Sequence, residues 1–239
     1  MYAANMPHIL LDFLSPERCV LCGNYITFKN RAGPYPLCGN CADSFVPEEG
    51  PRCGLCSMPL VSETGKCLEC RGRSVSFNGN YSLFLYADPK TARCVTAYKG
   101  QGFTGLGSFF CGFLAEAYFN RYRDAPLVPV PPRTASLRRR GFDHVLLLCR
   151  RLRRGYGIPY LRLLRRRGKT REQKTLNREE REENLRGHIV PRRWAGEGVP
   201  ETVVLLDDVF TTGATADECS RALKSMGAEK VFVLTLAID

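Results

Sequence analysis

Two carboxylates stand directly before a run of small hydroxylated residues near the end of this 239-residue chain. The acids are Asp207 and Asp208, and the run is Thr211-Thr212-Gly213-Ala214-Thr215. Backbone N–H groups and hydroxyls around a glycine hold phosphate, particularly where they open a helix. Carboxylates do not bind phosphate, but they accept hydrogen bonds from sugar hydroxyls and hold hydrated magnesium. Together these features predict a ribose 5-phosphate site with magnesium.

The elements around this turn have the pattern of a crossover unit. Val203–Leu206 is a short apolar run rich in β-branched residues, as in a buried parallel strand. Helical spacing starts at Thr215, Gly227 is placed as a helix stop, and Val231–Ile238 reads as the next strand. Ligands of such sheets bind in the strand-to-helix loop. The alternative, an acidic turn that only caps a helix, does not explain both acids and Thr-Thr-Gly-x-Thr in this order.

Eight of the twelve cysteines form four Cys-x-x-Cys pairs. Two such pairs complete a tetrahedral four-sulfur site, and four thiolates leave no position open for catalysis. A segment of about 50 residues has little core of its own, so we expect structural zinc that supplies folding energy. Iron in the same cage and thiol redox chemistry are the alternatives. The simplest grouping is sequential: Cys19, Cys22, Cys38 and Cys41 for one metal, then Cys53, Cys56, Cys67 and Cys70 for a second.

Other residues of this module and the remaining cysteines carry simpler expectations. Gly23, Gly39 and Gly54 adjoin ligands, where knuckle turns commonly need a positive φ. The isolated cysteines stand in apolar stretches and are expected to be small buried hydrophobes. They are Cys94, Cys111, Cys149 and Cys219.

The excess positive charge is confined to one segment. Residues 133–193 contain 20 Lys and Arg against 6 Asp and Glu, whereas the rest of the chain is slightly acidic. Such a segment attracts polyanions such as nucleic acid or phosphates. The alternative is a solvated basic face that only maintains solubility.

Membrane and export signals are not expected from the sequence. No apolar run reaches about 18 residues, which predicts no membrane span. Residues 1–18 predict a short amphipathic helix, since the stretch from His8 to Leu14 is interrupted by Asp12. Without a basic start and a cleavage site it is not expected to be a signal peptide, which predicts a cytoplasmic protein with reduced thiols.

The middle of the chain alternates between strand and helix patterns. Asp143 is placed to cap a helix that ends near Gly155 or Gly157. The stretch from Arg165 to Asn184 is highly charged and predicts a mobile loop or a partly exposed helix. The other expected elements are a strand over Tyr81–Tyr86, helices over Lys90–Lys99 and Phe103–Tyr122, a strand over Leu127–Pro132 and a basic loop over Arg133–Gly141.

The turn from Leu205 to Thr215 resembles the phosphoribosyl-pyrophosphate (PRPP) signature of type I phosphoribosyltransferases. With the other motifs and the cysteine module, nearly the whole chain resembles the ComF family. Asp143 and His144 depart from the Asn and Gln that are usual there, and His188 and Ile189 depart from a small residue and an aromatic. The other motifs are Tyr98-Lys99-Gly100, Val128-Pro129-Val130-Pro131, Arg138-x-Arg140-Gly141-Phe142, Thr170-x-x-Gln173 and Arg181-x-x-Asn184.

The resemblance implies an α/β fold: a phosphoribosyltransferase-like parallel sheet flanked by helices over 80–239, preceded by a double zinc ribbon over 19–75. PRPP with magnesium would contact Asp207, Asp208 and Thr211–Thr215, with the two acids as the candidate catalytic residues. The expected pyrophosphate contacts are Lys99, Arg138, Arg140 and Arg181.

Two functions remain open at this point. The resemblance implies handling of single-stranded DNA during transformation, with a helicase or another competence protein as partner. The alternative is an active phosphoribosyltransferase of nucleotide metabolism with an unknown acceptor, although no residue is identified as an acceptor reader. Steep salt dependence of DNA binding would favour the first, and acceptor-dependent release of pyrophosphate the second.

Overall fold

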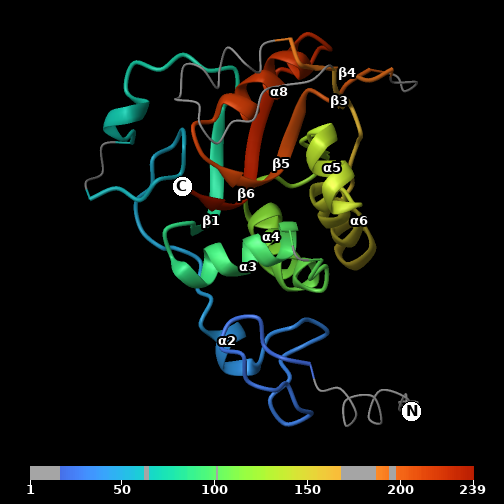
Figure 1. The fold of residues 1–239 in the computed structure, drawn as a ribbon. Coiled ribbons are helices and arrows are strands. Elements are labelled where there is room, and N and C mark those ends of the chain that lie inside the picture. Colours follow the sequence, from blue (N-terminus) through green and yellow to red (C-terminus); the bar gives the residue numbers. More distant parts are fainter. Residues whose placement is uncertain (1–16, 62–64, 101, 168–186, 194–197) are drawn as a thin grey trace.

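A computed structural model describes residues 17–61, 65–100, 102–167, 187–193 and 198–239. Figure 1 shows a sheet with helices on both faces and a smaller N-terminal part beneath it. The predicted helix over residues 1–18 lies almost wholly outside the described residues. In chain order the elements are α2 (Gly39–Asp43), a 3-10 turn (Leu68–Cys70), β1 (Gly79–Leu85), α3 (Pro89–Gly100), α4 (Leu106–Arg121), β2 (Leu127–Pro129), α5 (Thr134–Arg140), α6 (His144–Tyr156), β3 (Leu164–Arg166), β4 (Ile189–Pro191), β5 (Thr202–Phe210), α8 (Ala214–Lys224) and β6 (Lys230–Ile238).

The main sheet is parallel and has four strands in the order β1-β6-β5-β2. Strand β5 is central, pairing with β6 from Thr202 opposite Lys230 to Phe210 opposite Ile238. Its neighbour on the other side is β2, where Leu127 lies opposite Val204. The β5–α8–β6 unit confirms the crossover predicted from the sequence. Strands β3 and β4 form a separate antiparallel pair.

The sheet separates two hydrophobic cores, and the alternation of β5 decides which residue enters which core. Val204 and Leu206 belong to the core shared with α3, α4 and α6. Val203 and Leu205 belong to the core shared with α8 and the β3–β4 pair. All four side chains are fully buried. Figure 1 shows α8 on one side of the sheet and α4 with α6 on the other. The four isolated cysteines are buried in these cores, as predicted.

Local sequence signals explain where the helices next to the site begin and end. Asp143 Oδ1 accepts a hydrogen bond from Leu146 N at 2.9 Å, which confirms Asp143 as the N-cap of α6. The helix stops at Gly157, whose φ of 72° suits glycine.

Three predicted elements differ from the structure. Residues 134–140 form α5 rather than a basic loop, because Ala, Leu and Arg favour helix and Gly141 ends it with a φ of 77°. Arg165 and Arg166 belong to β3, not to a loop or helix, and the rest of that predicted segment, 168–184, lies outside the described residues. Strand β5 continues through both acids to Phe210 instead of ending at Leu206, because these acids find partners that outweigh their low strand propensity.

The two cysteine clusters contact different parts of the sheet domain. Phe45 follows the first cluster and packs edge-on against Phe84 and Phe109, with ring centroids 5.4 and 5.1 Å away. The second cluster runs along the outer edge of β1. Its residues Leu55 and Cys56 accept hydrogen bonds from Asn80 N at 3.0 Å and Asn80 Nδ2 at 2.7 Å.

Further contacts cover the same edge of β1. Ser82 N donates to Ser57 Oγ at 3.1 Å, and Ser82 O accepts from Arg52 Nη1 at 2.7 Å. Glu48 N donates to Leu83 O at 3.2 Å. Four backbone groups of β1 between Asn80 and Leu83 are therefore hydrogen-bonded to the cysteine module. Within the described ranges, no helix has the length and apolar character needed to cross a membrane.

Candidate phosphate-binding site and metal centres

The turn between β5 and α8 is built around Gly213, the N-cap of α8. Gly213 has a φ of 81° and lies beneath the ring of Phe210, where a Cβ atom would come within 2.8 Å of Phe210 Cζ. Ala214 N is 3.4 Å from Thr212 Oγ1 at the start of the helix. A cavity of about 30 Å³ is lined by Asp207, Thr211, Gly213 and Thr215 among others. The turn therefore brings one acid together with residues of the predicted phosphate loop.

Replacing Gly213 with alanine is expected to destabilise the protein by about 2 kcal/mol, because a left-handed φ costs an L-residue about 1–2 kcal/mol and the new methyl must displace Phe210. Chemical denaturation measures the loss. Gly155→Ala is the matched control, since nothing lies within 4 Å of a Cβ there. An unchanged Gly213→Ala variant would contradict the tight packing of this turn.

Asp208 lies on the α3 and α6 side of the sheet and is 7% exposed. Lys99 Nζ is 2.8 Å from Asp208 Oδ2, and His144 Nε2 is hydrogen-bonded to the same oxygen. Burial acts to raise the pKa of Asp208, but Lys99 and His144 outweigh it and hold that pKa well below its usual range. Asp208 is therefore ionised.

His144 joins this acid to a second cation. Arg140 Nη1 is 3.0 Å from His144 Nδ1. Arginine only donates, so Nδ1 accepts, and the proton lies on Nε2, which donates to Asp208. Glutamine is the usual residue at this position in the family that the sequence resembles. Its side-chain amide also offers an N–H donor and an oxygen acceptor. The departure at His144 therefore preserves the link from Arg140 to Asp208.

Asp207 has a different environment from Asp208. It continues the alternation of β5 toward the α8 side, where it interacts electrostatically with Arg166 and Cys219. Burial, followed by the charge of Asp208, raises the pKa of Asp207 to about 7. Arg166 Nε and Nη1 are buried without a hydrogen-bond partner among the described residues. One acid is thus firmly ionised, while the other titrates near neutrality.

The structure places the predicted pyrophosphate residues unequally. Lys99 contacts Asp208 directly, and Arg140 reaches it through His144. Arg138 is exposed on α5, and Arg181 lies outside the described residues. Sequence reasoning missed Arg166, since a charged stretch gave no sign of a buried guanidinium.

The cysteine clusters fit tetrahedral metal. The ligand sulfurs in each predicted set of four lie within 4.8 Å of one another, as the sequential grouping requires. Zinc–sulfur bonds of about 2.3 Å place tetrahedral sulfurs about 3.8 Å apart. Cys22 Sγ and Cys38 Sγ are 3.8 Å apart in the first cluster, and Cys56 Sγ and Cys67 Sγ are 3.7 Å apart in the second. The residues therefore fit two structural zinc ions.

The two clusters repeat one knuckle geometry. Cys19 N bonds Asn24 O, and Cys53 N bonds Met58 O, both at 2.8 Å. The left-handed position belongs to Gly23 in the first knuckle, at a φ of 75°, as predicted. In the second it belongs to Ser57, at 74°, whose hydroxyl is bonded by Ser82 N of β1. The expectation of a positive φ at Gly39 and Gly54 is wrong. Gly39 begins the helix α2, and Ser57 takes the left-handed position after the Cys53/Cys56 pair.

Backbone donors prepare one thiolate in each cluster. Burial acts to raise the pKa of Cys53, but N–H groups of Cys56, Cys67 and Leu55 outweigh it and lower this pKa to about 6. In the first cluster similar donors lower the pKa of Cys19 to about 7. The thiols of Cys53 and Cys19 therefore lose their protons at little cost in free energy when a metal ion binds.

We expect two zinc ions per chain in protein purified without chelator, measured by plasma mass spectrometry. Cys22→Ser should leave one ion, because three thiolates hold zinc less tightly than four. Cys149→Ser is the control, since Cys149 is buried away from both clusters and should not change metal content. Iron in the purified protein, or a single ion in the wild type, would contradict the assignment.

Residues that follow the second cysteine cluster are hydrogen-bonded to the turn between β5 and α8. Arg73 Nη2 donates to Thr212 O at 2.8 Å, three residues after the last ligand of that cluster. Ser76 N donates to Asp217 Oδ1 in the first turn of α8 at 2.6 Å. No sequence pattern signalled these contacts. The metal module therefore holds both the turn and the start of α8.

Comparison with known proteins agrees with both parts of this architecture. The family model described as "Double zinc ribbon domain" matches residues 10–71. The chain is 27% identical to Competence protein ComFC of Streptococcus pneumoniae over 92% of this chain and 99% of that protein. It is 28% identical to Competence protein F of Haemophilus influenzae over 92% of this chain and 96% of that one. The chain is therefore similar over most of its length to proteins named as competence proteins.

Solved structures similar to this chain include two enzymes. One is a hypoxanthine phosphoribosyltransferase of Staphylococcus aureus, with 16% identity and a TM-score of 0.34 over 56% of this chain and 63% of that one. Another is described as the allosteric regulatory enzyme of purine biosynthesis, with 20% identity and a TM-score of 0.38 over 59% of this chain and 30% of that one. The chain thus spans less than two thirds of either protein.

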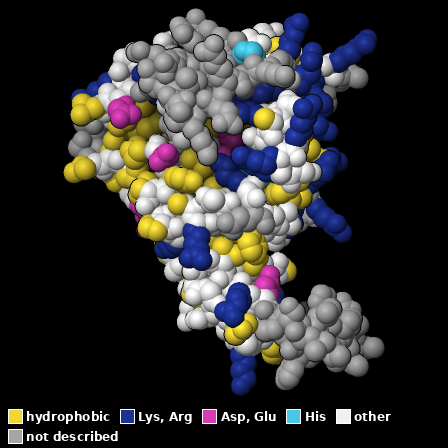
Figure 2. Space-filling model, viewed as in Figure 1, with side chains coloured by type: hydrophobic (Ala, Val, Ile, Leu, Met, Phe, Trp, Pro, Cys, Tyr) yellow, Lys and Arg dark blue, Asp and Glu magenta, His cyan; other side chains and the backbone are white. Residues whose placement is uncertain are grey.

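The chain also carries a strongly basic face. Figure 2 shows Lys and Arg side chains gathered on the side of α5, α6 and the β3–β4 pair. The exposed residues of these elements and their flanks include Arg138, Arg139, Arg150, Arg153, Arg154, Arg165, Arg167 and Arg193. Much of the basic segment identified in the sequence therefore lies exposed on one side of the molecule.

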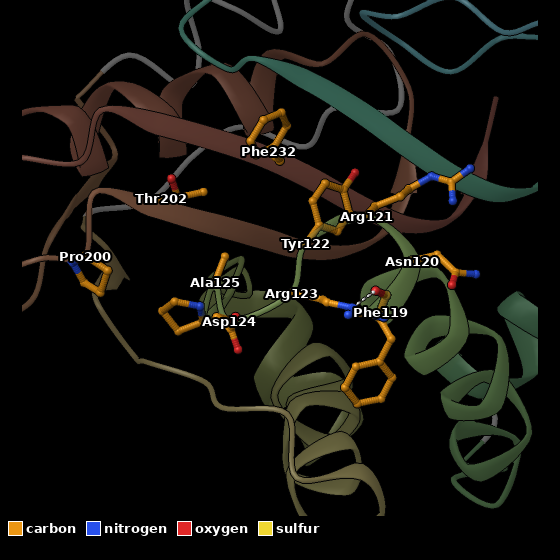
Figure 3. Close-up of a pocket in the computed structure, with 11 residues that line it drawn as sticks. Phe119, Asn120, Arg121, Tyr122, Arg123, Asp124, Ala125, Pro200, Thr202 and Phe232 are labelled. Atoms are coloured by element: carbon orange, nitrogen blue, oxygen red, sulfur yellow. Dashed lines mark hydrogen bonds between the residues drawn. The ribbon is translucent and has the colours of Figure 1, made fainter.

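A larger cavity, of about 690 Å³, lies at the opposite end of the sheet. Figure 3 shows its lining from the end of α4 and the start of β5, including Arg123, Asp124 and Thr202. The rings of Tyr122 and Phe232, 5.5 Å apart, form part of its wall. Parallel sheets bind ligands at the carboxyl ends of their strands, whereas this cavity lies at the amino ends of β2 and β5.

Proposed function

We propose that this chain binds PRPP with magnesium at the β5–α8 turn and handles single-stranded DNA during natural transformation. One observation supports the binding of PRPP. The candidate phosphate-binding turn and two acids, one with a raised pKa and one with a lowered pKa, lie together at one edge of the sheet. The relatives named competence proteins support the physiological half.

Each part of the turn has a chemical task in this proposal. Thr211–Thr215, at the N-terminus of α8, would bind the 5-phosphate through backbone N–H groups and hydroxyls. Asp207 and Asp208 would accept hydrogen bonds from the ribose hydroxyls. Magnesium, when bound, would neutralise negative charge on the pyrophosphate of PRPP. The positive charges of Lys99 and Arg140, which lie around Asp208, would attract that pyrophosphate.

The DNA half rests on the basic face. Exposed arginines on one side of the molecule bind phosphates without reading sequence, and nearby rings allow bases to stack. Tyr156 is 43% exposed at the end of α6, beside Arg153 and Arg154. This combination suits single strands, whose bases are unpaired and open to stacking.

Calorimetric titration of the zinc-loaded chain with PRPP and magnesium tests the ligand. Wild type should bind, and the Asp207→Asn/Asp208→Asn variant should lose at least about tenfold in affinity, since both acids accept hydrogen bonds worth about 1 kcal/mol each. Asp124→Asn, an exposed acid at the far end of the sheet, is the matched control. Absence of binding by the wild type would refute the PRPP site.

Oligonucleotide binding at several salt concentrations tests the DNA half. Wild type should weaken steeply with salt, and Arg150→Gln/Arg154→Gln should flatten the slope by about two charges. Lys224→Gln/Lys230→Gln, two exposed cations on α8 and β6, provide the control. Pyrophosphate release that depends on an added acceptor, together with no binding of single strands, would favour an active phosphoribosyltransferase instead.

A further inference from the structure

A wide pocket lies between the second cysteine cluster and the phosphate turn. It has a volume of about 780 Å³, within the range of pockets that hold small molecules. Thr211 and Thr212 form one wall, and Ile238 at the end of β6 forms part of the floor. The pocket therefore opens at the carboxyl ends of β5 and β6, the edge where parallel sheets bind ligands.

The remaining walls are apolar side chains of the second cluster. Met58, Leu60 and Leu68 line the pocket. Leu68 is 80% exposed, and its neighbour across the pocket, Val61, is fully exposed. Figure 2 shows hydrophobic side chains gathered on the side of the second cluster. Apolar surface grouped around a hollow is typical of a binding site.

The charges around the pocket argue against an anion in its interior. Four thiolates around zinc carry a net charge of about −2. Lys66, Arg71 and Arg73 also line the pocket, but Glu69 and Asp239 line it as well and offset much of their positive charge. Arg73 is also held to Thr212 O at 2.8 Å, which fixes the rim against the turn. The surroundings thus disfavour an anion inside the pocket, and its apolar side chains suit a flat uncharged ring.

The pocket and the phosphate turn share a wall. Thr211 lines both this pocket and the small cavity that includes Asp207, Gly213 and Thr215. A molecule with a phosphate on the turn can therefore extend a ring into the apolar pocket. Nucleotides have this form, with phosphate, sugar and base in sequence.

We propose that the second zinc ribbon forms the base pocket of a site for a 5′-phosphorylated nucleotide, whose phosphate lies on Thr211–Thr215. The inference rests on the proposed phosphate-binding function of that turn. Two sources offer the same chemistry: a free nucleoside monophosphate and the 5′-phosphate end of a single DNA strand. The zinc ribbon is then part of the ligand site as well as a folded support.

Titration of the zinc-loaded full chain with ribose 5-phosphate, AMP and adenosine tests the pocket. AMP should bind about tenfold more tightly than ribose 5-phosphate, since stacking a base contributes about 1–3 kcal/mol. Leu68→Glu should abolish that gain and leave ribose 5-phosphate binding unchanged. Leu68 is exposed, so this variant should fold. Phe28→Glu is the matched control, because Phe28 is 92% exposed on the first ribbon and should keep the gain.

A second pair of probes separates the sources. A short oligodeoxyadenylate with a 5′-phosphate is compared with the same strand ending in a hydroxyl. A gain from the terminal phosphate that Leu68→Glu removes assigns the pocket to DNA ends, and a gain for AMP alone assigns it to free nucleotides; both support the pocket.

Two results would overturn the inference, and they are distinguishable. If ribose 5-phosphate binds but neither AMP nor the phosphorylated strand binds more tightly, or if Leu68→Glu keeps the gain, the base pocket is refuted and the phosphate site stands. If no probe binds at the turn, the phosphate site and the base pocket fall together.

Discussion

Replacing Asp207 with asparagine should stabilise the protein at alkaline pH. At about pH 8.5 the free energy of unfolding should rise by about 3 kcal/mol, and at about pH 5.5 by about half as much. The reason is the pKa of Asp207, raised to about 7 by burial and by the charge of Asp208. Asparagine keeps an oxygen that can accept from Asp208 N, at 2.9 Å in this structure.

The pH window follows from the sign of that shift. A carboxyl whose pKa is higher in the folded state favours the protonated fold, so its ionisation costs stability. The cost begins above the unfolded pKa of about 4 and is complete above about 7. Asparagine cannot ionise, so the advantage of the variant grows with pH across this window.

Chemical denaturation at the two pH values measures the effect, with zinc content checked in each sample. Asp208→Asn is the control with the opposite sign. The pKa of Asp208 is depressed by Lys99 and His144, so its stabilisation is present at both pH values and the variant should be less stable at both. An equal gain for Asp207→Asn at both pH values would contradict the raised pKa. A gain that also preserves PRPP binding would remove Asp207 from the ligand site.

Loss of the second zinc should weaken ribose 5-phosphate binding about 10- to 30-fold, whereas loss of the first should change it less than about twofold. Two hydrogen bonds, from Arg73 to Thr212 and from Ser76 to Asp217, link the second cluster to the turn. Each contributes about 1 kcal/mol to holding the turn in place. Cys70→Ser and Cys22→Ser compare the two clusters.

Three measurements separate this coupling from general unfolding. Metal analysis shows which ion is lost, calorimetry gives the affinity, and amide exchange reports whether residues 212–217 open. Exchange at this turn should quicken in Cys70→Ser and stay slow in Cys22→Ser. If Arg73→Ala, with both zinc ions retained, weakens binding as Cys70→Ser does, the hydrogen bond carries the coupling. Equal effects of both cysteine variants would refute it.

Much of this architecture could be predicted because it depends on local pattern. The four Cys-x-x-Cys pairs determined both clusters in the right grouping. The β-branched run, the turn and the helical spacing after it predicted β5, α8 and β6. Asp143 was identifiable as a cap because capping needs only a short polar side chain one turn before the helix N–H groups.

What the sequence could not predict depends on partners far along the chain. The contact of Arg73 with Thr212 joins residues 139 positions apart. Asp207 and Asp208 look like one acidic pair, yet strand alternation sends them to opposite faces with different neighbours. The sequence could not predict that β5 continues through these two acids, because the contacts of Lys99 and His144 with Asp208 are visible only in the structure. The burial of the Arg166 guanidinium could not be predicted either, because Arg166 stands in a charged stretch and its burial depends on the packing of α8 over β3.

The contacts between the second ribbon and β1 protect the sheet from association with other molecules. Strand β1 is an outer strand, and such strands offer unpaired N–H and C=O groups to any extended chain that approaches. Leu55, Ser57 and Arg52 bond the backbone N–H groups of Asn80 and Ser82 and the carbonyl of Ser82. If zinc holds the second ribbon in place, we expect removal of zinc with a chelator to uncover this edge of the sheet and to promote aggregation. The metal content of a preparation should then affect its solubility as well as its fold.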